Sequence, residues 1–161
     1  MTVRPAAPLR VLVLCTANSA RSQLAEALLA HLGGDLIVAA SAGSEPGAMV
    51  HPLAVAVLAE RGIVWDGKRP KGIEEVRDAS WDLVITVCDA ARDACPVLPG
   101  AMMVHWGMAD PARADPADQR EAFRRTAEQL DRRVQRLLAL PLVTMDGETL
   151  GAAAAAIHLQ E

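Results

Sequence analysis

Residues 9–22 read LRVLVLCTANSARS, and they predict a buried strand that leads directly to a reactive thiol. The run before Cys15 is apolar at every position except Arg10, which is typical of a strand buried on both faces of a sheet. A helical pattern begins soon after, at about Ser19. The Cys15 thiol is therefore expected in a short loop between a strand and a helix, where backbone N–H groups can gather around an anion.

Apolar runs and amphipathic stretches alternate along the rest of the chain. The apolar runs predict strands over residues 36–40, 83–87 and 101–105. The amphipathic stretches predict helices over residues 19–32, 52–61 and 117–140. This alternation indicates an α/β fold, a three-layer sandwich in which helices cover both faces of a parallel sheet. Ligands of such folds bind beyond the carboxyl ends of the strands.

The chain is expected to form a single domain over residues 1–161, with its core at about residues 9–140. Residues 143–161 lie outside the alternating pattern and read as a C-terminal tail of unknown role. Their alanine run, residues 152–156, is compatible with a short helix.

Composition excludes several classes of protein. The net charge of −4 and the absence of a basic run argue against a nucleic-acid partner. No apolar stretch approaches the ~18 residues of a membrane span, and residues 1–8 lack the apolar centre of a signal peptide. Three cysteines, an odd number, suit reduced thiols, so we expect a cytoplasmic protein.

The loop after the first strand has the residue types of an oxyanion site. Arg21, six positions after Cys15, can bind two oxygens of a tetrahedral anion. The same positive field is expected to lower the Cys15 pKa; a fall from about 8.5 to about 6 raises the thiolate fraction at pH 7 from roughly 3% to roughly 90%, worth about 3.4 kcal/mol. Asn18 suits a left-handed position, and Ser19 or Ser22 can add a hydroxyl hydrogen bond. The predicted anion-binding residues are Thr16, Ala17, Asn18, Ser19, Ala20, Arg21 and Ser22.

Asp110 follows the fourth predicted strand and precedes Pro111. A carboxylic acid at this edge of the sheet can protonate a leaving oxygen. An Asp-Pro pair is also a common turn, and from the sequence alone the turn is the better interpretation. Asp115, in a second Asp-Pro pair further from the strand, is expected to cap the long helix.

Cys88 and Cys95 lie seven residues apart, just after the third predicted strand. The simplest interpretation is two small apolar core residues, and one pair supplies too few ligands for zinc. In a helix their Cα atoms would be roughly 10.5 Å apart, whereas a disulfide needs about 7 Å or less, so a bond between them would unwind the helix. The four histidines show no ligand spacing, and no metal site is predicted.

These motifs together resemble one enzyme family, the arsenate reductases with a low-molecular-weight phosphatase-like fold, and most closely its thioredoxin-coupled branch. The resemblance covers about residues 9–140 and implies a four-stranded parallel sheet in the order 2-1-3-4, which brings Cys15 and Cys88 close together. It rests on the segments Leu12 to Cys15 through Arg21-Ser22, Ser41-Ala42-Gly43, Arg69-Pro70-Lys71, Asp82 to Cys88, Cys95-Pro96, and His105-Trp106-Gly107 through Asp110-Pro111.

The resemblance implies a mechanism with no bound cofactor. Cys15 would attack arsenate held by the loop and Arg21, and Asp110 would assist loss of an oxygen. Cys88 would then attack Cys15 and release arsenite. Cys95 would resolve the Cys15–Cys88 disulfide to Cys88–Cys95, which thioredoxin would reduce.

Two positions depart from the family pattern. Ala17 is often glycine there, and a positive φ would strain it. Lys71 is basic where some relatives have an acidic potassium ligand, so we expect no potassium site.

Other functions remain open at this stage. The first is a low-molecular-weight protein tyrosine phosphatase, which would use Cys15, Arg21 and Asp110 through a phosphocysteine; the few aromatic residues of the chain argue against a phosphotyrosine slot. The second is a non-enzymatic oxyanion or redox sensor. Glutaredoxin or a low-molecular-weight thiol could replace thioredoxin as reductant. We expect a monomer.

Overall fold

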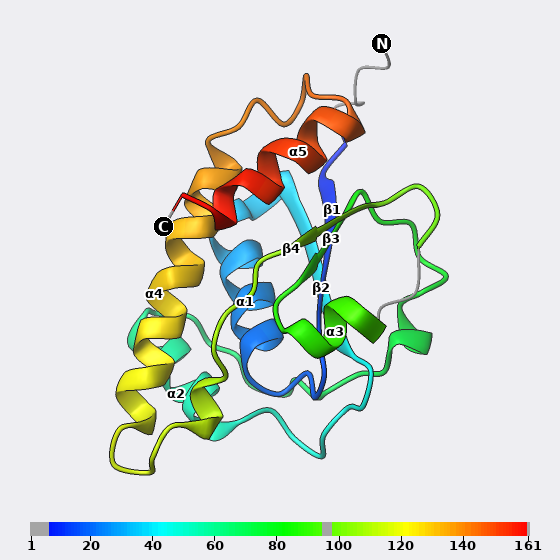
Figure 1. Ribbon diagram of the computed structural model, residues 1–161. Coiled ribbons are helices and arrows are strands. Elements are labelled where there is room, and N and C mark those ends of the chain that lie inside the picture. The colour runs from blue at the N-terminus through cyan, green and yellow to red at the C-terminus, as the bar shows by residue number, and fades with distance from the viewer. Residues whose placement is uncertain (1–6, 95–97, 161) are drawn as a thin grey trace.

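The computed structural model describes residues 7–94 and 98–160, so Cys95 lies outside the described residues (Figure 1). Four parallel strands form one sheet in the order β2-β1-β3-β4, which confirms the predicted topology. The strands are β1 (Leu9–Cys15), β2 (Ile37–Gly43), β3 (Leu83–Thr86) and β4 (Met102–His105). The α-helices are α1 (Arg21–Gly33), α2 (Pro52–Glu60), α3 (Asp89–Ala94), α4 (Gln119–Leu138) and α5 (Gly147–His158).

The strand register places the functional residues at one edge of the sheet. Cys15 pairs with Gly43 at the end of β2, and Leu14 pairs with Thr86 at the end of β3. Cys88 follows Thr86 by two residues. Both cysteines therefore lie beyond the carboxyl ends of neighbouring strands, as predicted.

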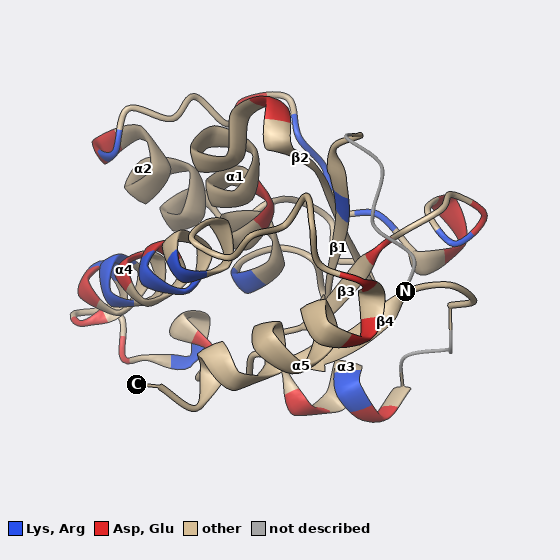
Figure 2. Ribbon diagram, turned by 90° about the horizontal axis from the view of Figure 1, so that it is seen from above, with Lys and Arg blue, Asp and Glu red and all other residues tan. Residues whose placement is uncertain are grey.

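Apolar side chains cover both faces of the sheet. On one face α1, α2 and α4 pack together, and Figure 2 shows these helices on one side of the sheet. The apolar stripe of α4 is fully buried there: Phe123, Ala127, Leu130, Val134 and Leu137. A smaller cluster on the other face joins Leu12 and Leu14 to Trp81. Acidic and basic residues are mixed along α4, as Figure 2 shows by colour, and Arg120 and Arg124 of this helix bind Glu60.

The C-terminal segment differs from its prediction as a tail outside the main pattern. Helix α5 packs on the edge strand β4, and Leu150, Ala154 and Ile157 enter the main core. The indole N–H of Trp106 donates to the Ala154 carbonyl at 2.8 Å. Small residues allow this close approach: a Cβ at Gly151 would lie 2.7 Å from Met102 Cε. The sequence did not indicate which face of α5 is buried, because alanine is compatible with the core and with the surface.

Helix ends also differ from the prediction. Helix α4 starts at Gln119 with Asp118 at its N-cap position, so the expected cap, Asp115, was wrong. The Asp115 carbonyl instead accepts from the Asp118 N–H at 2.8 Å and closes a turn before the helix. Helix α1 starts at Arg21, not at Ser19, because the loop that follows Cys15 uses two more residues.

Candidate active site

The Cys15 sulfur lies at the end of β1, inside the loop that the sequence predicted. It is 2.8 Å from the Ser22 hydroxyl and accepts the Asn18 backbone N–H at 3.1 Å. Of the two serines considered from the sequence, Ser22 makes the contact with the thiol. The Ser19 carbonyl accepts the His51 N–H at 2.8 Å, which ties the loop to the start of α2.

Asn18 holds the loop from within. Its φ of 53° is left-handed, as predicted, and its side chain is buried. Its amide N–H groups donate to Ser22 Oγ and to Ser41 Oγ, both at 2.8 Å. Because Ser22 Oγ accepts from Asn18, the Ser22 hydroxyl proton is free to point at the Cys15 sulfur. The loop thus supplies the sulfur with two donors, a pattern that favours thiolate.

Three further side chains support Asn18, and the sequence analysis gave none of them a role. Gln23 Nε2 donates to Asn18 Oδ1 at 3.1 Å, and the Trp65 indole N–H holds Gln23 at 2.9 Å. Ser41 donates to the buried Glu26 carboxylate at 2.7 Å. One signal in the sequence could have indicated this network: Gln23 and Glu26 are three residues apart, so they share a face of the first turns of α1, next to the loop.

The end of β2 forms a second support for the loop. A Cβ at Gly43 would lie 2.3 Å from the Thr16 carbonyl oxygen, so only glycine allows the strand this close to the loop. The backbone then follows the loop: Glu45 N–H donates to the Thr16 carbonyl and Gly47 N–H to the Ala17 carbonyl, each at 2.9 Å. Among the described residues Asn18 alone combines a side chain with a positive φ, so the feared strain at Ala17 does not arise.

The predicted low pKa of Cys15 is wrong: in the structure the pKa is raised. Burial raises the pKa of the Cys15 thiol, and this exceeds the lowering by the hydrogen bonds from Ser22 and Asn18. Negative charge on Cys88 is a further, smaller cause that raises the pKa of Cys15. The expectation failed because it counted the donors of the loop without the desolvation of a side chain that is 3% exposed.

Arg21 is turned toward the mouth of the site. Its Nη1 donates to the Met108 carbonyl at 3.1 Å, and its Nη2 lies 3.6 Å from Asp110 Oδ2. Asp110 also accepts the Ala112 N–H at 3.0 Å and so caps the short turn Pro111–Arg113. The turn interpretation of the Asp-Pro pair is confirmed, and the Asp110 carboxyl group also lies beside Arg21 of the anion loop. Its role as a proton donor stays a prediction.

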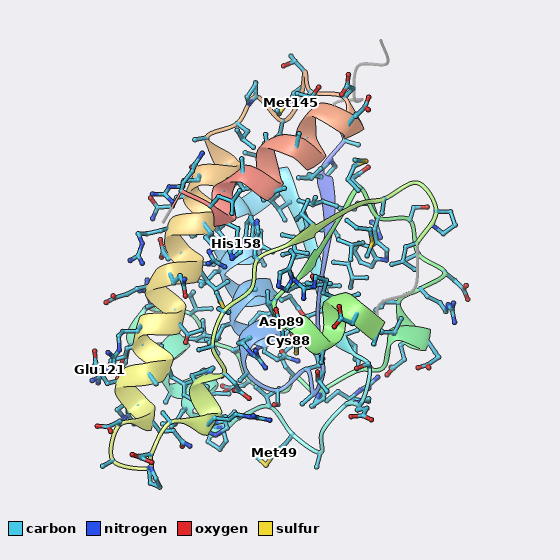
Figure 3. All side chains as sticks on the ribbon, viewed as in Figure 1. Met49, Cys88, Asp89, Glu121, Met145 and His158 are labelled. Carbon is cyan, nitrogen blue, oxygen red and sulfur yellow. The ribbon has the colours of Figure 1, made fainter. Side chains whose placement is uncertain are left out.

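Cys88 shares this mouth. Its sulfur lies 3.4 Å from the Thr16 hydroxyl and accepts the Ala91 N–H at 3.4 Å. Figure 3 shows Cys88 and Asp89 together at the start of α3. One pocket joins the predicted residues of loop, acid and second thiol; it is lined by Thr16, Ala17, Arg21, Cys88, Ala90, Asp110 and Arg113.

The pocket lining contains two arginines, Arg21 and Arg113, and no aromatic side chain among the residues described there. The aromatic residues of the chain, Trp65, Trp81, Trp106 and Phe123, are all buried. A planar phosphotyrosine ring would therefore meet Ala17, Ala90 and Arg113 at this mouth, which gives it little surface for stacking.

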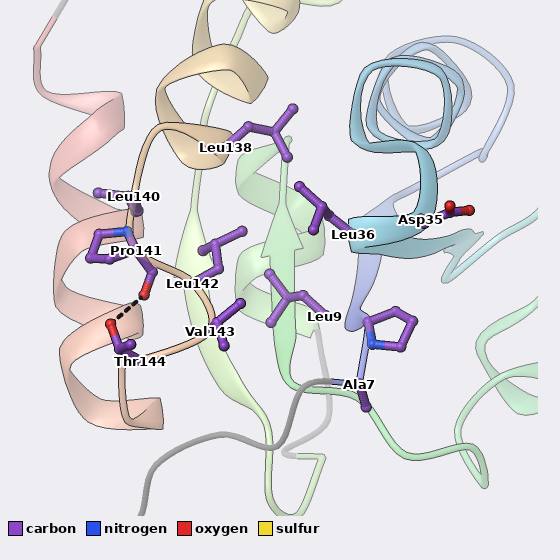
Figure 4. Close-up of a pocket in the computed structure, with 11 residues that line it drawn as sticks. Ala7, Leu9, Asp35, Leu36, Leu138, Leu140, Pro141, Leu142, Val143 and Thr144 are labelled. Atoms are coloured by element: carbon purple, nitrogen blue, oxygen red, sulfur yellow. Dashed lines mark hydrogen bonds between the residues drawn. The ribbon is translucent and has the colours of Figure 1, made fainter.

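A second pocket lies at the other end of the sheet, where β1 begins (Figure 4). Its lining is mostly apolar, with Leu36, Leu138, Leu142 and Val143 around Leu9. In Figure 4 the Asp35 carboxylate points away from these side chains. With neither a thiol nor a convergent set of polar groups, this lining does not form a catalytic site.

The described residues contain neither a metal-binding cluster nor a membrane-spanning helix. In residues 7–94 and 98–160, no group of three or more His, Cys, Asp or Glu side chains is placed to hold a metal ion. Over the same residues, each helix is too short or too polar to cross a membrane.

Comparison with known proteins identifies the family. Residues 10–151 match the family described as low molecular weight phosphotyrosine protein phosphatase. The chain belongs to this family.

Its similar relatives include arsenate reductases. The chain is 38% identical over 125 residues to the arsenate reductase of Halalkalibacterium halodurans, covering 76% of this chain and 89% of that protein. It is 32% identical over 131 residues to the glutaredoxin arsenate reductase of a Synechocystis species, covering 81% of this chain and 96% of that protein.

A solved structure agrees with this result. The thioredoxin-dependent arsenate reductase of Corynebacterium glutamicum is 34% identical, with a TM-score of 0.66 over 82% of this chain. The match spans only 61% of that protein's length. The chain is therefore a homologue of arsenate reductases within the phosphatase family.

Proposed function

We propose that this protein is an arsenate reductase that uses three cysteines in sequence. The observation that carries the proposal is the place of Cys88: its sulfur contacts Thr16 of the anion loop and lines the same pocket as Arg21 and Asp110. A phosphatase needs no second thiol at this point. Reduction of arsenate needs one, because arsenic must gain two electrons.

The first step forms a bond between sulfur and arsenic. Arsenate enters the pocket, Arg21 turns from Asp110 to bind two of its oxygens, and the loop N–H groups bind the others. The Cys15 thiolate attacks arsenic, and one oxygen leaves as water with a proton from Asp110. The predicted binding residues, Thr16 to Ser22, surround the anion in this step.

The second step transfers the electrons. The Cys88 thiolate attacks the Cys15 sulfur, the sulfur–arsenic bond breaks, and its electron pair leaves with arsenic as arsenite. A Cys15–Cys88 disulfide remains. Cys95 then attacks Cys88, which restores the Cys15 thiolate and forms a Cys88–Cys95 disulfide.

An external dithiol closes the cycle. We infer thioredoxin as the reductant, because the relative from Corynebacterium glutamicum is thioredoxin-dependent. A second relative, from Synechocystis, is a glutaredoxin arsenate reductase. Glutaredoxin therefore remains an alternative reductant for this protein, as does a low-molecular-weight thiol. Reduced thiols suit the reducing cytoplasm, and we propose a cytoplasmic monomer of one domain, residues 1–161.

The test is arsenate-dependent NADPH consumption with thioredoxin and thioredoxin reductase, run beside hydrolysis of p-nitrophenyl phosphate. We expect sustained arsenate turnover and weak hydrolysis. Cys15→Ser should abolish both activities, and Cys95→Ser should allow at most one arsenate turnover per protein. Strong hydrolysis without arsenate turnover would instead identify a phosphatase, and single-turnover behaviour of the unaltered protein would identify a sensor.

A further inference from the structure

His105 ends β4 and has a hydrogen-bond partner on each ring nitrogen. Its Nδ1 lies 2.7 Å from the Thr86 hydroxyl on the neighbouring strand β3. Its Nε2 lies 3.0 Å from Asp89 Oδ1, at the first residue of α3. The imidazole therefore links the sheet to the short helix that follows Cys88.

These partners fix a proton on the Nε2 atom of His105. A carboxylate only accepts, so His105 Nε2 carries a proton toward Asp89. In the neutral imidazole Nδ1 then accepts the Thr86 hydroxyl proton. In the protonated imidazole Nδ1 donates to Thr86, whose hydroxyl can turn to the Val104 carbonyl at 3.4 Å. The Asp89 contact survives in both states.

The surroundings are shaped for this ring. A Cβ at Gly107 would lie 2.7 Å from His105 Nε2, so a side chain there would strike the imidazole. On the other side the ring of His158, in the last turn of α5, lies 6.0 Å away in an edge-on arrangement. The His105 side chain is 18% exposed, whereas Asp89 is 77% exposed. The more buried His105 ring therefore restrains the exposed Asp89 side chain.

The contact bears on Cys88 because Asp89 is its direct neighbour in the chain. The Cys88 sulfur accepts the Ala91 N–H from the first turn of α3, and that turn begins with Asp89. Arg92 also lies 4.0 Å from the same carboxylate oxygen, but it is half exposed and belongs to α3 itself. Only His105 ties the Asp89 carboxylate to the sheet among the contacts described for it.

We propose that His105 is a positioning residue for Cys88: by holding Asp89 it fixes the first turn of α3 and the N–H group that bonds to the Cys88 sulfur. This role rests on the proposed function only in that Cys88 is there the attacking thiol of the second step. Without the contact, the turn loosens and the Asp89 carboxylate is free to approach the sulfur. Both changes disfavour the Cys88 thiolate.

The test uses the full chain with Cys15→Ser and Cys95→Ser, which leaves Cys88 as its only thiol. Two further variants separate the ring nitrogens of His105. His105→Asn keeps a polar atom near the Nδ1 position, beside Thr86, but is too short for Asp89. His105→Gln places its amide near the Nε2 position and keeps a donor for Asp89. The readout is the rate of alkylation by iodoacetamide as a function of pH.

We expect His105→Asn to move the midpoint of this profile upward by about half to one pH unit, and His105→Gln to leave it within a few tenths of a unit. In an Asp89→Ala background His105→Asn should cause no further shift, because the effect passes through Asp89. His31→Ala, at an exposed histidine of α1, is the matched control. Thermal unfolding checks that each variant is folded.

An unchanged midpoint in His105→Asn would overturn the proposal. An equal shift with Asp89 present or absent would also overturn it, since His105 would then act by another route. The alkylation assay needs neither arsenate nor thioredoxin. If the protein does not reduce arsenate, the alkylation profile still tests the role of His105. If His105 does not position Cys88, the arsenate turnover assay still tests the proposed function.

Discussion

Removing the Ser22 hydroxyl tests how this loop activates Cys15. Burial raises the pKa of the Cys15 thiol, and the side-chain hydrogen bond from Ser22 is the largest opposing cause. Ser22→Ala deletes that donor at 2.8 Å and leaves the Asn18 N–H at 3.1 Å. The pKa should therefore rise further, because the charged form loses more than the neutral form does.

The size of the effect follows from the contact. A hydrogen bond to a charged acceptor contributes about 1.5–3 kcal/mol, and sulfur is a weak acceptor, so about 1–2 kcal/mol is expected here. This free energy corresponds to a rise of about 0.7–1.5 units in the pKa of Cys15. Well below the midpoint, the thiolate population and the rate of its reactions should fall roughly 5- to 30-fold.

The assay is alkylation of Cys15 by iodoacetamide against pH, in a chain that carries Cys88→Ser and Cys95→Ser. Ser44→Ala is the matched control, since Ser44 is exposed just past β2. Ser22→Ala also removes the hydroxyl oxygen that accepts from the buried Asn18 amide. This loss should lower the free energy of unfolding by about 1–3 kcal/mol, measured by urea unfolding. A midpoint that does not move, in a folded Ser22→Ala protein, would refute the assignment of Ser22 as the donor to the thiolate.

The remaining predictions concern the acid, the loop support and α5. Asp110→Asn should lower arsenate turnover by roughly 10²-fold or more with little change in protein stability; equal turnover would exclude Asp110 as the proton donor. Gly43→Ala should displace the loop at Thr16 and reduce arsenate affinity, measured by the KM for arsenate, whereas Gly67→Ala should leave it unchanged. Ile157→Ala should cost about 2–4 kcal/mol in urea unfolding, and a loss under about 0.5 kcal/mol would show that α5 adds little to the core.

The sheet was predictable because its strands are continuous apolar runs separated by amphipathic helices, and the order 2-1-3-4 followed from the family resemblance. The left-handed Asn18 and the meeting of Cys15, Arg21 and Asp110 at one edge were predictable too. Side-chain positions that depend on contacts between distant residues were not. The donor chain from Asn18 through Ser22 and the packing of α5 on β4 both require the folded geometry.

The wrong prediction of the Cys15 pKa has the same origin. The sequence shows Arg21 six positions from the thiol and indicates a positive field, but it does not show that the guanidinium is engaged elsewhere. In the structure Arg21 binds Met108 O and faces Asp110 at 3.6 Å. The positive field that should stabilise the thiolate thus acts partly on a carboxylate, and burial of the sulfur outweighs the hydrogen bonds from Ser22 and Asn18.

This pairing of Arg21 with Asp110 gives the proposed reaction its order. An arsenate anion must draw the guanidinium away from Asp110, so binding leaves a carboxylate beside a new negative charge, with Arg113 as its remaining cation at 4.0 Å. Two such groups are stable side by side only with a proton between them. That proton is the one the departing oxygen needs. In the proposed reaction the contact between Arg21 and Asp110 therefore breaks when the anion binds, and the turn at Pro111 holds the Asp110 carboxyl group where a proton donor is required.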